Sequence, residues 1–382
     1  MTERLYDNGA LTSFEAKVTA CTETKGGFEI TLDRSAFFPE GGGQAGDSGR
    51  IGGVCVRDTY ERNGEVYHLC SAPIEAGTAV SCQVDADIRL RRMQNHSGEH
   101  LLMGFIHRKL GFENVGFRLG SSDVTLDLDG VITADELSEC EQLANEAIAR
   151  DVPITVSYPD EEALSAMHYR SKEGITGRVR IVTIEGIDVC ACCAPHLSST
   201  GQIGIVRVLY SESCRSGTRV HILCGLDALA LIRQQADSVS EISRLLSARP
   251  DRVTEYVRRL LDENLSLKRE LAAIEKQRAD EIISSLGSER RGSFCIFTKG
   301  LRRETLREIA NRTVKLTDGA AAVFCEEEGG FGYIIASENI PLRARTAEIN
   351  RAISGRGGGS DKMIEGHASA DRETVGEYIK TL

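Results

Sequence analysis

Two short runs in this chain carry imidazole and thiol side chains at a spacing of four residues. NHSGEH contains His96 and His100, and CCAPH contains Cys192 and His196. On a helix or a tight turn, this spacing brings two side chains to the same face. Three imidazoles and one thiolate form a mixed nitrogen and sulfur set that suits zinc. We therefore expect these four residues to bind one Zn²⁺ ion.

Other interpretations of the same residues remain open. The two helix histidines could simply be packed or solvated, and Cys190 or Cys193 could replace Cys192 as the thiolate. NHSGEH also fits the H-x-x-E-H motif of inverted zinc peptidases, in which Glu99 would be the general base and a distant acid such as Glu173 would complete the metal set. The peptidase interpretation leaves CCAPH unexplained.

A glycine segment is the third feature with chemical potential. In FFPEGGGQ, Gly41, Gly42 and Gly43 can bring bare backbone N–H groups close to a ligand, and the amide of Gln44 follows. A flexible turn is the alternative. The segment is not a phosphate-binding P-loop, because the Lys and Ser/Thr of that motif do not follow the glycines.

Composition limits the class of protein. The chain has 382 residues, 27% of them charged, which is typical of a soluble protein of two or three domains. The net charge of −11 argues against a chain that coats nucleic acid non-specifically. The twelve cysteines are scattered, and we see neither a secretory signal nor an apolar run that could span a membrane. We expect a cytoplasmic protein.

Periodicity predicts an α+β fold in four segments. Residues 1–88 alternate apolar and polar side chains, which predicts a β-barrel-like, glycine-motif domain. Residues 89–226 open with a helix that ends at Gly111 and continue as mixed α/β structure around the zinc ligands. Residues 227–287 are helical, and residues 288–382 alternate strands and helices in a small α/β domain.

The helical segment carries an apolar seam at alternating steps of three and four residues. Asn264 falls in the same register. The seam residues are Val253, Val257, Leu260, Leu267, Leu271 and Ile274. This pattern is typical of a coiled coil, so we expect a homodimer through this segment or the C-terminal domain. Packing against the same chain is the alternative.

Three motifs together resemble a known family. FFPEGGGQAGDSG, NHSGEHLL and CCAPHLSSTGQIG occur in the order found in the editing domain of alanyl-tRNA synthetases and in their free-standing relatives, the AlaX proteins. Arg219, in SGTRVHILCG, resembles the arginine of the family's closing strand. GRGGGSDKMIEG resembles the DHH-associated C-terminal domain of the synthetase. The class II charging motifs are absent, so the chain resembles the long free-standing form, which edits but does not charge.

The resemblance implies hydrolysis of the ester between a wrong amino acid and alanine tRNA, with serine as the main candidate and glycine as the second. It assigns zinc to His96, His100, Cys192 and His196, and the aminoacyl adenosine to a pocket lined by Gly41–Gly43, Gln44 and Arg219. Ser35 stands where the family usually has Thr and would bind the serine hydroxyl. Gln44, Glu99 and Asp188 are the candidate catalytic residues. A protein that uses zinc structurally and only binds tRNA is the non-enzymatic alternative.

Two departures from the family's motifs bear on tRNA contacts, and so do several clusters of basic residues. CCAP replaces the usual Gly-Gly-Thr pattern at the metal turn, and residues 360–362 replace the usual Arg-Pro-Asp. RLRRMQ at 89–94, the pair at 290–291, and arginines 302, 303 and 356 are the visible basic clusters. Each cluster alone could equally be a solvated charged face.

Overall fold

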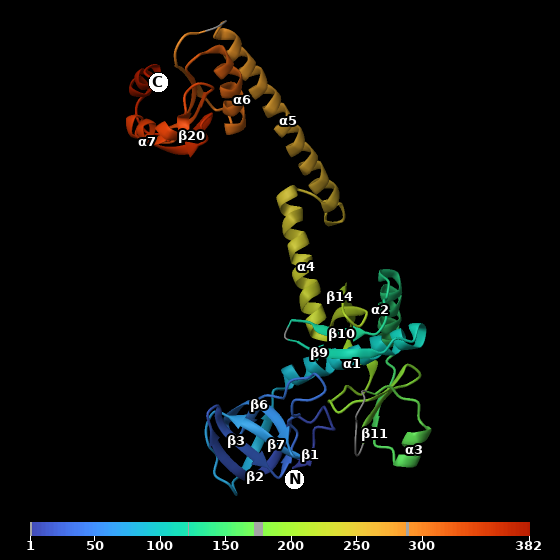
Figure 1. Cartoon of the computed structure of the whole chain (residues 1–382). Helices are drawn as coiled ribbons and strands as arrows, with labels where there is room; N and C mark the ends of the chain where they lie inside the picture. The colour runs from blue at the N-terminus through green and yellow to red at the C-terminus, as the bar shows by residue number, and fades with distance from the viewer. Residues whose placement is uncertain (1, 121, 172–178, 288–289) are drawn as a thin grey trace. The chain divides into compact units, whose positions relative to one another are not determined.

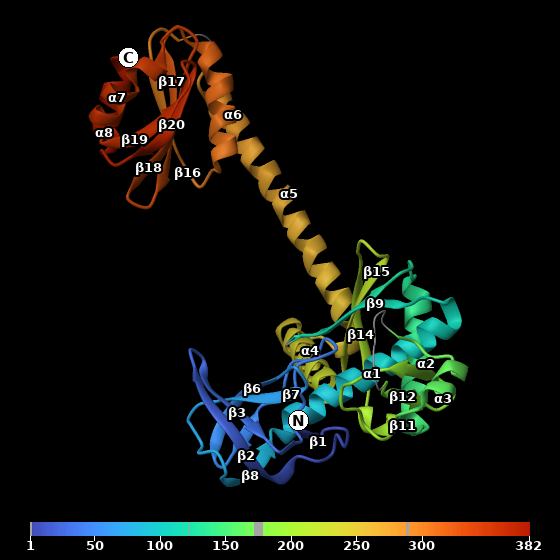
Figure 2. The ribbon, with the colours of Figure 1, turned by 60° about the horizontal axis from the view of Figure 1, so that its bottom comes forward.

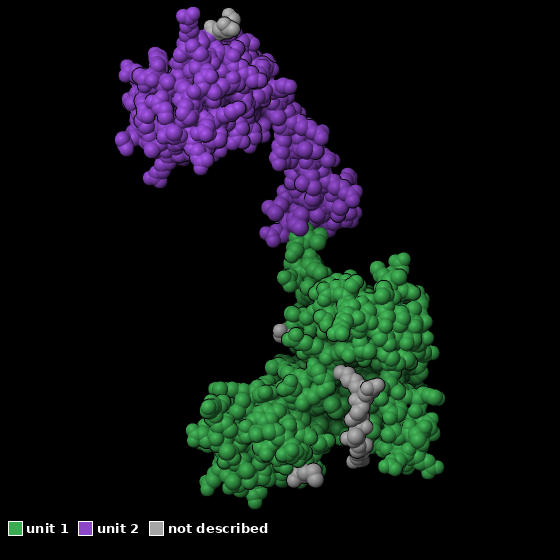
Figure 3. Space-filling view, in the orientation of Figure 1, with its two compact units in different colours: residues 1–240 green, residues 241–382 purple. Residues whose placement is uncertain are grey.

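The structure is a computed structural model that describes residues 2–120, 122–171, 179–287 and 290–382. The chain divides into two compact units, residues 1–240 and 241–382, which Figure 3 colours separately. Each unit has its own hydrophobic core, so each is described by itself.

The first unit begins with a closed six-stranded barrel (Figure 1). Around the barrel the strand order is β2-β3-β7-β6-β5-β8. The strands are β2 (Ser13–Thr24), β3 (Gly27–Leu32), β5 (Gly49–Ile51), β6 (Val54–Arg62), β7 (Glu65–Cys70) and β8 (Ala79–Val84). Alternate residues of these strands are buried inside, and a short pair, β1 (Glu3–Arg4) with β4 (Arg34–Ser35), lies outside the closed order. The N-terminal barrel expected from the alternating pattern is confirmed.

Helix α1 (Ala86–Leu110) is the central helix of this unit. Every residue from 93 to 104 is buried, so the helix is packed on all sides rather than along one stripe. It ends at Gly111, whose φ of 73° is the left-handed conformation that favours glycine. Arg89, in its first turn, is only 1% exposed, and its Nε donates to Asp47 of the barrel at 3.0 Å. This buried pair fastens the helix to the barrel, so Arg89 is not a surface charge for RNA.

Two sheets and a second helix complete the core around α1. One sheet has the order β14-β15-β10-β9, and the other has the order β11-β12-β13. Helix α2 (Ala134–Ala149) begins with a capping box formed by Thr133 and Glu136, whose Thr-x-x-Glu spacing is the sequence signature of this cap. The remaining elements are β9 (Asn114–Leu119), β10 (Val124–Leu128), β11 (Ile154–Ser157), α3 (Glu161–Ala166), β12 (Ile181–Ile184), β13 (Asp188–Ala191), η1 (Thr200–Ile203), β14 (Val206–Ser213) and β15 (Thr218–Cys224).

The helical segment is interrupted once. Helix α4 (Gly225–Leu246) and helix α5 (Val253–Ser285) are separated by Ser247, at a φ of 50°, and by the short turn η2 (Pro250–Arg252). We expected helix from 227 onwards without this break. Because proline has no N–H and clashes with the preceding turn, Pro250 is the sequence signal for it.

The second unit contains a five-stranded mixed sheet in the order β16-β17-β18-β20-β19. Figure 2 shows α6 on one face of the sheet and α7 with α8 on the other. The glycine run GRGGG forms the edge strand β19 (Gly355–Gly359), which the sequence did not predict. The other elements are β16 (Phe294–Lys299), α6 (Arg303–Thr313), η3 (Val314–Leu316), β17 (Ala320–Glu327), β18 (Gly330–Ser337), α7 (Leu342–Ala352), β20 (Met363–Ala368) and α8 (Arg372–Lys380).

The mixed α+β class is confirmed, whereas the finer division at residues 88, 226 and 287 stays a prediction. The seam side chains of α5 are largely exposed in this single chain, for example Leu267 at 63%. Their pairing with a second chain is therefore also still a prediction. No described helix is both long and apolar enough to cross a membrane.

Candidate active site

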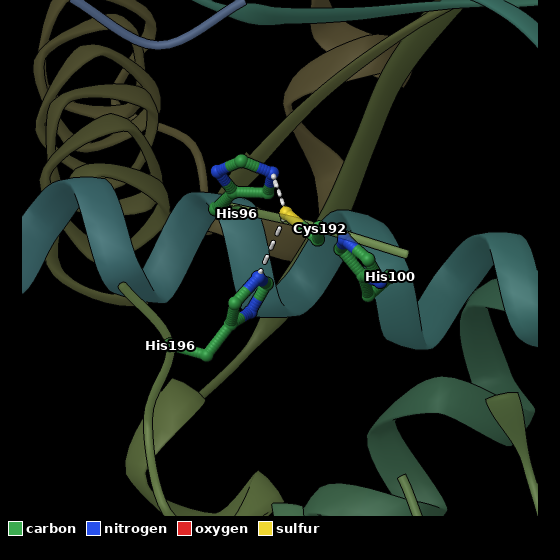
Figure 4. Close-up of side chains that lie close together, drawn as sticks. All are labelled: His96, His100, Cys192 and His196. Carbon is green, nitrogen blue, oxygen red and sulfur yellow. Dashed lines mark hydrogen bonds between the residues drawn. The ribbon is translucent and has the colours of Figure 1, made fainter. Parts of the chain in front are cut away.

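The two motif runs converge. His96 and His100 project from the same face of α1, and Cys192 and His196 come from the turn that follows β13. Candidate ligand atoms of these four residues all lie within 4.8 Å of one another. Figure 4 shows the three imidazoles arranged around the sulfur of Cys192.

The distances fit a tetrahedral zinc site. Sγ of Cys192 lies 3.3 Å from Nε2 of His196 and 3.5 Å from Nε2 of His96. Zinc bonds of ~2.1 Å to nitrogen and ~2.3 Å to sulfur, meeting at the tetrahedral angle, place the two atoms about 3.6 Å apart. The donor chemistry and these two distances are compatible with a single zinc ion.

Each imidazole is held at its other nitrogen. Nδ1 of His96 contacts Oε1 of Gln44 at 2.9 Å, and Nδ1 of His196 contacts Oγ of Ser97 at 3.1 Å. Nδ1 of His100 lies 3.2 Å from Oδ2 of Asp188. Such outer contacts fix the ring orientation and leave Nε2 for a metal, as in most metal-binding histidines.

The surroundings of Cys192 favour its thiolate form, which is the form that binds a metal. Burial alone would raise the pKa of the Cys192 thiol, but the neighbouring His96 and His196 rings lower that pKa well below its usual value. Burial lowers the pKa of His196 to about 3, which keeps this imidazole neutral. A thiolate and a neutral imidazole are the forms that bind zinc. Burial alone would lower the pKa of His100, but Cys190, Asp188 and Cys192 together raise that pKa, so zinc binding would displace a proton from this ring.

A second layer of contacts holds the metal turn and the acid behind His100. Arg180 Nη1 donates to the carbonyl oxygens of Cys192 and Ala194 at 2.9 and 2.8 Å. Arg170 binds both carboxylate oxygens of Asp188, each at 2.8 Å. Both oxygens of Asp188 are thus engaged by Arg170, and one of them also contacts His100.

The cluster forms part of the wall of a cavity of about 370 Å³. His96, His100 and Cys192 line it, together with Glu99 and Gly42. Aromatic and basic side chains form much of the remaining lining, namely Arg4, Tyr6, Phe117, Tyr158, Arg170 and Arg180. The cavity can therefore hold a small polar group with a flat ring next to the cluster.

The other predicted site residues lie at different places. Ser35 is fully buried in the barrel region, 2.8 Å from Nε2 of His68, and Arg219 on β15 forms a bidentate pair with Asp127. Neither is part of the described lining of the cavity. Gly43, at a φ of +85°, allows β9 to approach, because an added Cβ would lie 2.6 Å from a backbone oxygen of that strand.

The two candidate catalytic carboxylates, Glu99 and Asp188, differ in their position relative to the cavity. Glu99 lines the cavity, its Oε1 accepts from Asn114 Nδ2 at 2.7 Å, and its Oε2 lies 3.8 Å from Nε2 of His100. Asp188 lies behind His100 and is not part of the described lining. Glu173, the acid of the peptidase interpretation, lies outside the described residues.

The chain is similar to several known proteins. The family described as "Threonyl and Alanyl tRNA synthetase second additional domain" matches residues 179–220, which include Cys192 and His196. An alanyl-tRNA editing protein, AlaX-L of Pyrococcus horikoshii, is 25% identical over 98% of this chain and 96% of its own length. The resemblance to the long free-standing alanyl-tRNA editing proteins is confirmed.

Larger proteins also match. An alanine–tRNA ligase of Methanopyrus kandleri is 28% identical over 94% of this chain, which spans only 42% of that ligase. The solved C-Ala domain of Aquifex aeolicus alanyl-tRNA synthetase is 19% identical and covers 24% of this chain and 94% of that domain. Its TM-score of 0.22 does not establish a common fold.

Several residues at this site could not be predicted from a single sequence. Arg170, Arg180 and Asn114 are isolated polar residues far from the motif runs, and only the fold brings them to the cluster. Ser97 is different, because it lies inside NHSGEH and could have been suspected as a partner of a ligand.

Proposed function

We propose that this chain hydrolyses the ester bond between a wrong amino acid, serine or glycine, and alanine tRNA. The observation that carries the proposal is the convergence of His96, His100, Cys192 and His196 on one cluster, three of whose members line a cavity together with Gly42. Similarity over nearly the whole length to a protein named as an alanyl-tRNA editing protein supports the substrate class.

Zinc is the proposed cofactor, held by the four converging residues. A zinc ion at such a site can polarise an ester carbonyl or lower the pKa of a water from ~15.7 towards ~7. Four protein ligands are more typical of a structural site than of a catalytic one. A zinc ion that only shapes the pocket is therefore the alternative role.

The chain's own residues would position the substrate and move the proton. Phe117, Tyr6 and Tyr158 offer ring faces on which an adenine could stack, and Gly42 lets a backbone approach closely. Gln44 would act from behind, because its Oε1 orients His96. Its buried Nε2 has no hydrogen-bond partner among the described residues.

Of the two candidate acids, Glu99 is the better general base. It lines the cavity, and only one of its oxygens is used by Asn114. Asp188 is instead held by Arg170 and would orient His100. A general base must reach the proton that it removes, and within this geometry Glu99 does so more directly.

The test is deacylation of alanine tRNA carrying serine, glycine or alanine, with wild-type protein and Glu99→Gln. We expect hydrolysis of the serine ester, sparing of the alanine ester, and a fall of about 10²–10⁴-fold for Glu99→Gln. Tight binding of the tRNA without turnover would favour the non-enzymatic alternative. Cleavage of peptides instead would favour the peptidase.

Dimer formation and a cytoplasmic location are part of the same proposal. The exposed seam on α5, including Leu267 and Leu271, supports pairing with a second copy. Analytical ultracentrifugation of the wild type and of a variant with both leucines changed to Glu tests pairing through the α5 seam. Equal sedimentation of the two proteins would refute pairing through this seam. All twelve cysteines are free thiols, which suits a reducing compartment.

A further inference from the structure

Strand β13 and the turn after it direct more than one sulfur towards His100. Residues 188, 190 and 192 alternate along an extended segment, so Asp188, Cys190 and Cys192 share one face. The side chains of all three interact with His100. His100 therefore lies against two thiols, of which the motif spacing singled out only one.

The candidate ligand atoms form two overlapping groups. Those of His100, Asp188 and Cys190 lie within 4.8 Å of one another, and so do those of the four-residue cluster that contains His100 and Cys192. Cys190 is partly buried and lines the same cavity as Cys192. Because His100 is common to both groups, an ion bound to His100 that shifts towards β13 comes close to Cys190, which shares no group with His96 or His196.

The surroundings favour one shared ion over two separate ions. Both oxygens of Asp188 are bound by the guanidinium of Arg170, which is nearly buried. A second cation at Asp188 would lie beside this positive charge and would have to displace it. Cys190 interacts electrostatically with the same arginine, but its sulfur forms no hydrogen bond to Arg170 among the described contacts, and a thiolate is a preferred ligand of zinc-class ions.

We propose that Cys190 is a reserve thiolate ligand of the cluster, so that an ion held without Cys192 shifts towards β13 and is held by Cys190 with His100 and at least one of the other imidazoles. The proposal rests on the metal-binding half of the proposed function and is independent of the tRNA substrate. It also explains how one protein ligand can leave without loss of the ion.

Cys193 provides the matched control. It follows Cys192 directly and also lines the cavity, but it belongs to neither group of candidate ligands. Its sulfur lies 3.6–3.7 Å from where side chains on Gly41 and Gly42 would begin. A general effect of removing a thiol from this turn would therefore appear in Cys193→Ser as well.

The experiment binds Co²⁺ alone to purified full-length protein and records the thiolate-to-cobalt charge-transfer band, with zinc affinity measured by chelator competition. The variants are Cys190→Ser, Cys192→Ser, the double variant and Cys193→Ser. We expect Cys192→Ser to keep one ion and a thiolate band, and the double variant to lose the band and at least about 10-fold in affinity. Cys193→Ser should match the wild type.

Loss of the band in Cys192→Ser, or equal affinity of Cys192→Ser and the double variant, would overturn the proposal. If Cys192→Ser does not fold by circular dichroism, His196→Asn replaces it, because it opens a position while both thiols remain. The thiolate-to-cobalt band of His196→Asn should then be about twice as intense as the band of the double variant His196→Asn, Cys190→Ser. Equal band intensities in these two variants would overturn the proposal. Deacylation is measured separately, so a reserve ligand in a protein without deacylase activity would refute only the proposed function.

Discussion

Removal of Arg170 should weaken metal binding although Arg170 is not a ligand. Its Nε and Nη2 each donate to Asp188 at 2.8 Å, and Asp188 Oδ2 lies 3.2 Å from Nδ1 of His100. The side chain of Arg170 is 9% exposed and that of Asp188 is 3% exposed, so solvent screens this chain of contacts little. Arg170→Met would leave Asp188 buried and free to turn away from His100.

The size of the effect follows from the position of Asp188. Loss of a group that holds the outer nitrogen of a metal-binding histidine typically costs about 10–100-fold in metal affinity. This corresponds to about 1.4–2.7 kcal/mol, because each tenfold change is ~1.4 kcal/mol. Since Arg170 acts through Asp188, we expect Arg170→Met to fall within this range and Asp188→Asn to be at least as severe.

The assay is competition for zinc with a chelating dye, after circular dichroism has shown that the variant is folded. Arg219→Met is the matched control, because Arg219 also forms a bidentate pair, with Asp127 at 2.6 and 2.8 Å, but touches no ligand of the cluster. It should leave the zinc affinity unchanged. Wild-type affinity in Arg170→Met, or an equal loss in Arg219→Met, would refute the reasoning.

Three further predictions concern the framework of the first unit. Burial lowers the pKa of His68 to about 4, against an ordinary value of 6.5, so the unfolded chain takes up a proton in this window that the folded protein does not. The free energy of unfolding should therefore fall by up to about 3 kcal/mol as the pH falls from ~6.5 to ~4, and urea titrations of His68→Phe should show a shallower dependence. Gly43→Ala should lower the melting temperature and disturb the cavity, whereas Gly53→Ala, at a φ of +83° with nothing within 4 Å of the added Cβ, should show backbone strain alone. Equal effects of the two would count against a packing role for the first glycine. Arg89→Met should cost up to about 3–5 kcal/mol in urea unfolding, because, of the two described ion pairs of the buried Asp47 carboxylate, it leaves only the longer one, to Arg92 at 3.4 Å, and a loss below about 1 kcal/mol would contradict this.

The sequence predicted the parts of the fold that depend on local pattern. The end of α1 at Gly111 and the capping box at Thr133 and Glu136 follow from local backbone chemistry, and both are found. The break at Pro250 had a local signal too, but the helical periodicity on both sides outweighed it. The edge strand β19 had none, because a glycine run has little intrinsic strand preference and forms a strand only where a neighbouring strand pairs with it.

The candidate site also has residues that a local sequence pattern predicted and residues that it did not. The four cluster residues were accessible from spacing, since each pair is close in sequence and only one long-range convergence had to be assumed. Arg170 and Arg180 reach the cluster through three-dimensional packing, which the sequence intervals between them and the motif runs do not reveal. Ser35 illustrates the opposite case. Its hydroxyl was predicted from the family to face a substrate, but in the structure it contacts His68, and its role at the ester stays a prediction.

The most direct measurement is hydrolysis of seryl-tRNA(Ala) by three preparations of the same protein: as purified, stripped of metal, and stripped and then reloaded with one equivalent of Zn²⁺. We predict rapid hydrolysis in the first, a loss of at least about 10²-fold in the second, and recovery in the third. Full activity in a folded, metal-free preparation would contradict the claim that the His96, His100, Cys192 and His196 cluster is the centre of the reaction.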